Sequence, residues 1–124
     1  MINFDTVRKI GLTLPEVEES TAYGVTALKI RGQLFTCPAI NKSAEPGSLA
    51  IRISFEDRAE LIAADPDVYY ITDHYAPYPS VLVRMSRIRQ DALRDLLQMG
   101  WKFVIAKAKP KPRKPRVRAI RPRR

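Results

Sequence analysis

Residues 25–53 read VTALKIRGQLFTCPAINKSAEPGSLAIRI, and this stretch decides the fold. Apolar residues alternate with polar ones in its first and last parts, as in half-buried strands. The glycine of Arg31-Gly32 supplies the positive φ that a tight hairpin turn requires. The stretch therefore predicts strands over Val25–Arg31, Gln33–Ile40 and Leu49–Ile53.

The flanking residues predict three helices and two more strands. Asn3 and Ser54 are expected N-caps, and helices avoid continuing into the residues before Pro15 and Pro66. Leucines at helical spacing predict the last helix. The expected elements are a helix from Asn3 to about Leu14, an acidic connector over Glu16–Glu19, a helix from Ser54 to Asp65, strands Val68–Thr72 and Ser80–Met85, and a helix over Gln90–Ile105.

This order, α-β3-α-β2-α, predicts an α+β fold. Short turns between alternating strands favour an antiparallel five-stranded sheet, covered on one face by helices in a two-layer sandwich. We expect a single domain over residues 1–105 and a separate segment over residues 106–124.

The positive charge of the chain lies in its C-terminal segment. Residues 106–124 hold ten of the 22 basic residues and no acid, so residues 1–105 hold 12 basic and 13 acidic residues, a net charge of −1. Four prolines in the segment disfavour helices and strands, so we expect a disordered basic arm that binds a polyanion. A solvated tail that only aids solubility is the alternative. The candidate contacts are Lys107, Lys109, Lys111, Arg113, Lys114, Arg116, Arg118, Arg121, Arg123 and Arg124.

Four further cations lie in the expected strands. Lys29, Arg31, Arg52 and Arg84 are out of phase with the large aliphatic residues of their strands, and all 13 acids lie outside the five strands. If helices cover the aliphatic face, these cations share the other face and form a second contact for phosphates. Alternatively, their stems only cover half-buried sheet surface.

Residues that carry catalysis are few. We expect the single histidine, His74, to cap a loop, and the single cysteine, Cys37, to be a small apolar core residue. No metal-ligand spacing, phosphate-binding glycine loop or serine elbow is present, so we expect no cofactor, no metal and no enzymatic activity. The lack of a long apolar run, a signal sequence or a cysteine pair favours a cytoplasmic protein without a membrane partner.

Several short segments together resemble the MmcQ/YjbR-like small proteins, over about residues 4–105. They are LPEVEES from Leu14, Tyr23-Gly24, LKIRGQLF from Leu28, TDHY from Thr72, VLVR from Val81 and LRDLL from Leu93. The resemblance implies an α-β3-α-β2-α fold, also seen in secretion-chaperone-like domains, and DNA binding by a double-wing-like domain. Family members often have proline before the histidine, where this chain has Asp73, and the basic segment is an addition to the family pattern.

We therefore expect a non-enzymatic protein that binds nucleic acid, with DNA as the expected form, through phosphate contacts that carry little sequence preference. The first alternative is a protein-binding adaptor whose sheet face pairs with a partner and whose tail only localises it. The second is a small-molecule or enzymatic site around His74, Tyr75 and Glu18.

Overall fold

The computed structural model describes residues 2–108, which form three helices and six strands. In chain order they are α1 (Phe4–Gly11), β1 (Val17–Ala22), β2 (Val25–Ile30), β3 (Gln33–Pro38), β4 (Ser48–Arg52), α2 (Phe55–Ala64), β5 (Tyr69–Tyr70), β6 (Ser80–Arg84) and α3 (Gln90–Lys107). No helix among the described residues is both long and apolar enough to cross a bilayer. The disorder expected for residues 106–124 is wrong for residues 106 and 107, which end α3, and residues 109–124 lie outside the described residues.

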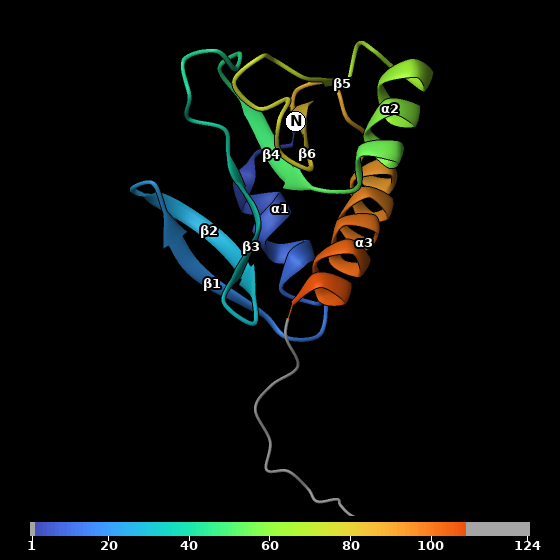
Figure 1. Ribbon diagram of the computed structural model, residues 1–124. Coiled ribbons are helices and arrows are strands. Elements are labelled where there is room, and N and C mark those ends of the chain that lie inside the picture. The colour runs from blue at the N-terminus through green and yellow to red at the C-terminus, as the bar shows by residue number, and fades with distance from the viewer. Residues whose placement is uncertain (1, 109–124) are drawn as a thin grey trace, which may run out of the picture.

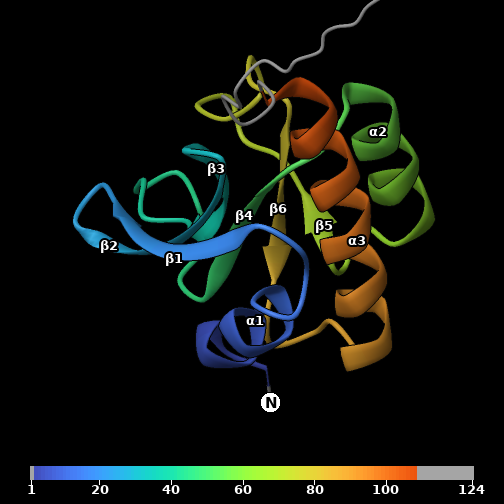
Figure 2. The ribbon, with the colours of Figure 1, turned by 90° about the horizontal axis from the view of Figure 1, so that it is seen from below.

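The six strands form one antiparallel sheet in the order β1-β2-β3-β4-β6-β5. Helices α1 and α3 pack on the same side of it, and α2 lies beside β5 (Figures 1 and 2). The core cluster is apolar and joins Leu93, Leu96 and Leu97 of α3 to Ile51 and other aliphatic residues of the strands, and the buried Thr36 lies opposite Ile51. The α+β class and the helical face are confirmed.

The prediction of five strands is wrong by one, because residues expected to form an acidic connector form β1 instead. This strand reads VEESTA and pairs with β2 over its whole length, from Val17 opposite Ile30 to Ala22 opposite Val25. Glutamate is a poor strand former, so strand propensity does not predict a strand at Glu18-Glu19. The prediction that all acids lie outside the strands is wrong for the same reason.

Two matching turns hold the first three strands together. Tyr23 and Gly24 have φ values of 54° and 80°, and Arg31 and Gly32 have values of 50° and 80°. Positive φ at both positions of a two-residue loop is the hairpin geometry that matches strand twist. The pair Tyr23-Gly24 is thus the sequence signal for β1, and it mirrors the Arg31-Gly32 pair that predicts the second hairpin.

The predicted helix starts are confirmed. The Asn3 side chain accepts a hydrogen bond from Thr6 N at 3.2 Å, and the Ser54 hydroxyl accepts one from Asp57 N at 3.0 Å. The first helix ends earlier than expected, at Gly11, and α3 runs further, to Lys107. Lys107, expected in the C-terminal segment, therefore belongs to a helix.

Loops lie along the sheet face that points away from α1 and α3. Cys37, Ala50, Leu82 and Tyr70 share this face by register, and Cys37 and Leu82 are buried. The hydroxyl of Tyr70 accepts a hydrogen bond of 2.8 Å from Glu45 N, in the loop between β3 and β4. This loop and the one between β5 and β6 lie together in Figure 1, so the second face of the sheet is not an open surface.

Candidate nucleic-acid interface

Arg31 is held by a carboxylate next to β1. Its Nε and Nη2 donate to the two carboxylate oxygens of Glu16, each at 2.8 Å. This two-point contact raises the pKa of Arg31 and uses the pair of N–H donors that a phosphate would need. Glu16 stands immediately before β1 at a φ of 64°, so the unpredicted strand is what brings its carboxylate to the β2–β3 turn.

Arg84 makes more hydrogen bonds within the fold than Arg31 does. Its Nε and Nη2 donate to Glu45 at 2.9 and 2.7 Å, and its Nη1 donates to the carbonyl oxygens of Pro66 and Asp67 at 3.1 and 3.2 Å. Its guanidinium also lies 4.2 Å from the centre of the Tyr70 ring. The hydrogen bond from Arg84 lowers the pKa of Glu45. Arg84 therefore joins two loops to the sheet.

Of the other two strand cations, Arg52 makes contacts within the fold, whereas Lys29 forms no ion pair within the described residues 2–108. Lys29 lies directly opposite Glu18 in the β1–β2 register, a position where opposite charges attract. Arg52 lies 5.9 Å from the centre of the Phe103 ring of α3, and its Nη1 donates to Leu34 O at 3.5 Å.

Register places Lys29, Arg52 and Arg84 on the sheet face away from α1 and α3, as predicted, but the four strand cations do not lie together. Arg52 pairs with Ser80 and Arg84 with Ser48, so these two arginines lie at opposite ends of the β4–β6 pair. Arg31 lies in the β2–β3 turn. A phosphate at Arg31, Arg52 or Arg84 would have to displace an interaction that the fold already makes.

The residues proposed for a small-molecule site do not come together either. His74 packs edge-to-face on Tyr75 at 5.0 Å between ring centres, in the loop after β5, whereas Glu18 lies in β1 at the opposite edge of the sheet. Cys37 is buried, and burial raises the pKa of its thiol. Within residues 2–108, no group of three or more histidine, cysteine or acidic side chains is placed to hold a metal ion.

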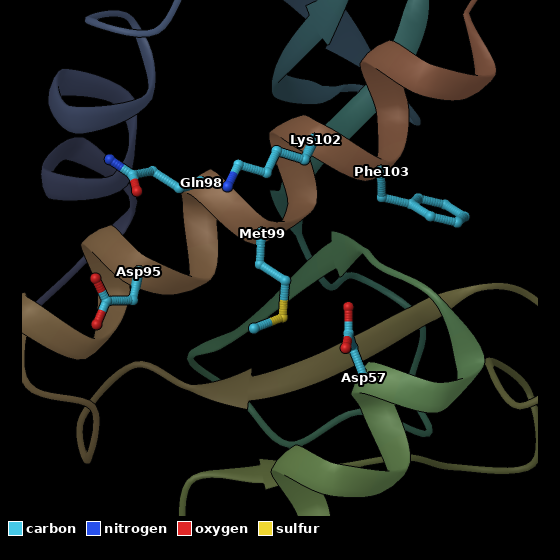
Figure 3. Close-up of a pocket in the computed structure, with 6 residues that line it drawn as sticks. All are labelled: Asp57, Asp95, Gln98, Met99, Lys102 and Phe103. Carbon is cyan, nitrogen blue, oxygen red and sulfur yellow. The ribbon is translucent and has the colours of Figure 1, made fainter.

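A groove between α2 and α3 lies along the middle of α3. It has a volume of about 460 Å³ and is lined by Asp57, Asp95, Gln98, Met99, Lys102 and Phe103. Figure 3 shows Met99 directed towards α2, and Gln98 and Lys102 leaving α3 on the side away from Asp57. With two carboxylates on its wall, this groove does not suit a polyanion.

The last described residues present cations at a defined point on the domain. Ala108 is only 7% exposed, and the ammonium of Lys107 lies 5.5 Å from the Phe103 ring centre. The basic segment thus follows a buried residue of the domain. Of the predicted contacts, Lys107 alone in the segment is described; the nine from Lys109 to Arg124 lie outside the described residues.

Sequence reasoning missed the exposed cations of the helical layer, Lys9, Arg94 and Lys102. Gln90, Arg94, Gln98 and Lys102 recur every four residues along α3, which places them in one stripe. That spacing is visible in the sequence, but only the fold shows that α1 lies alongside α3.

Comparison with known proteins agrees with this fold. The crystal structure of Deinococcus radiodurans protein DR2400, with the domain DUF419, superposes with a TM-score of 0.72 and 20% sequence identity, over 90% of this chain and 84% of that one. The uncharacterized proteins Rv2570 of Mycobacterium tuberculosis and Mb2600 of Mycobacterium bovis are each 39% identical over 62 residues. These matches span 47% of this chain and 48% of each relative, so the match covers about half the length of these relatives. The YjbR family model matches residues 12–103, and the chain belongs to the YjbR family.

Proposed function

We propose that this protein binds nucleic acid, with DNA as the expected form, and that the basic C-terminal segment supplies most of the phosphate contacts. The observation that carries the proposal is the separation of charge. Ten cations and no acid lie in residues 106–124, after a domain with a net charge of −1. Each phosphate that such a segment neutralises releases condensed counterions, which favours binding.

The structure supports this assignment of roles in two ways. Arg31 and Arg84, which were expected to assist the segment, are already held by Glu16 and Glu45. The segment itself continues from Ala108, which is packed against the domain. Sixteen further residues, if extended along a ligand, reach about 50 Å at roughly 3.1 Å per residue. We infer binding without catalysis, in the cytoplasm, and with little sequence preference because phosphates carry no sequence information.

Fluorescence anisotropy with a labelled duplex of about 25 base pairs tests the proposal, with the nine cations of residues 109–124 replaced by glutamine in the full chain. The expected result is a large loss of affinity and a much shallower dependence on salt, since the slope of log K against log salt is about −0.9 per neutralised phosphate. A control chain with residues 109–124 in shuffled order keeps the charge and should bind like the wild type. Equal affinity of the glutamine variant and the wild type would contradict the proposal.

The protein-binding adaptor stays a competing prediction with its own result. It expects that the protein binds a protein partner after the tail is removed, and that residues 1–105 alone have no affinity for DNA. Its sheet-face version also has to account for the loops tied to that face through Tyr70 and Tyr75.

A further inference from the structure

The second groove of the molecule lies between α1 and α3. It has a volume of about 460 Å³, and its floor includes Ile10 and Leu14. Its remaining lining residues are all hydrogen-bonding or positively charged: Thr6, Lys9, Thr13, Gln90, Arg94 and Gln98. No lining residue is acidic. This composition distinguishes it from the α2–α3 groove, where Asp57 and Asp95 line the wall.

The two cations of this groove are available to a ligand. Arg94 is exposed and forms no ion pair with any other residue of the described range 2–108. Lys9 pairs with Asp5 at 3.3 Å, but both side chains are more than half exposed. Exposed pairs of this kind contribute little free energy, so a phosphate can compete for the lysine. This differs from Arg31 and Arg84, whose side chains are only 23% exposed in their two-point contacts.

The groove continues as a stripe along α3. Gln90, Arg94, Gln98 and Lys102 follow one another at four-residue intervals, and Figure 3 shows Gln98 and Lys102 on the same side of the helix. Twelve residues of helix rise about 18 Å, close to the axial length of five base pairs at roughly 3.4 Å each. The stripe leads towards Lys107 and the start of the basic segment.

We propose that the α1–α3 groove binds the phosphate backbone of the nucleic acid that the C-terminal segment holds. Lys9 and Arg94 contribute the charge, and Gln90 and Gln98 donate hydrogen bonds. Lysine, arginine and glutamine are typical phosphate-contacting side chains, which position a duplex without reading its bases. The inference rests on the proposed function and deepens it: the folded domain joins the segment in one continuous contact, through its helical layer and not its sheet.

The test uses the full chain with Lys9→Gln and Arg94→Gln together, measured by anisotropy against the same duplex across a salt series. Loss of two phosphate contacts should reduce the salt slope by about 1.8 and the affinity by roughly tenfold or more near 0.1 M salt. The matched control is Lys42→Gln with Arg87→Gln. It makes the same change in net charge at two exposed cations placed in the β3–β4 loop and just before α3.

The outcomes separate the two proposals. If the groove variant binds like the control while the glutamine-substituted segment abolishes binding, the groove proposal is wrong and the proposed function stands. If the wild-type chain does not bind the duplex, both are wrong. If the groove variant unfolds, an NMR titration of the wild-type protein with the duplex tests the groove proposal instead. Binding in the groove should shift the side-chain amide signals of Gln90 and Gln98. Unshifted signals at saturating duplex would overturn the proposal.

Discussion

At Gly100, α3 lies close to the backbone of β4, and replacing this glycine by alanine tests that packing. A Cβ atom at this position would lie 2.8 Å from the carbonyl oxygen of Arg52 and 3.0 Å from two carbon atoms of Ile51. The nearest atom belongs to backbone in β4, so it cannot rotate away. The helix or the strand must shift to admit one methyl group.

Two opposing effects set the size of the change in stability. Alanine is favoured over glycine in a helix interior by about 1 kcal/mol. Overpacking a tight core costs typically about 1–3 kcal/mol, and contact with rigid backbone favours the upper part of that range. The expected net effect of Gly100→Ala is a destabilisation of about 1–2 kcal/mol. For a domain of about 100 residues this lowers the melting temperature by roughly 4–16 °C.

Urea unfolding, followed by circular dichroism or by the fluorescence of Trp101, measures the effect. Combining Gly100→Ala with Ile51→Val separates the two contacts, because it removes one of the Ile51 carbons and leaves the Arg52 carbonyl. Partial recovery is expected after correction for the cost of Ile51→Val alone. A Gly100→Ala protein that is as stable as the wild type, or more stable by the helix-propensity gain, would refute the close packing of α3 on β4.

Three further predictions follow from single side chains. The pKa of Glu45 is held below its ordinary 4.5 by the hydrogen bond from Arg84, so its stabilisation is present above pH 4.5 and is lost as the pH falls below it. The stability difference between wild type and Glu45→Gln should therefore shrink from about pH 5 to about pH 3 in urea titrations, and a constant difference would argue against the pair. The Nε of Arg52 is buried with no hydrogen-bond partner among the described residues. Arg52→Met should therefore change the free energy of unfolding by no more than about 1 kcal/mol and leave DNA affinity unchanged. A tenfold loss of affinity would show that Arg52 contacts the DNA. Burial raises the pKa of the Cys37 thiol, so a thiol reagent should react slowly with the native protein and rapidly in urea, and fast native reaction would contradict its burial.

The features predicted correctly from the sequence depend on interactions between residues close together in the chain. The caps at Asn3 and Ser54 are local hydrogen bonds, and the Arg31-Gly32 turn needs only its own backbone angles. The leucine spacing of α3 predicts the helix and its buried face. Propensity failed at β1, where pairing with β2 overrides the poor strand preference of Glu18 and Glu19.

The sequence by itself determined the α+β class, the apolar faces and the concentration of positive charge after residue 105, because periodicity and composition are properties of the chain. Only the tertiary structure decided which cations are available. Glu16 is 15 residues from Arg31 along the chain, and Glu45 is 39 residues from Arg84. At these separations, the fold must first place the segment that carries each carboxylate beside its arginine. Lys9 and Arg94 line one groove for the same reason: ion pairs and grooves depend on separation in space, and folding alone brings distant segments within a few ångströms.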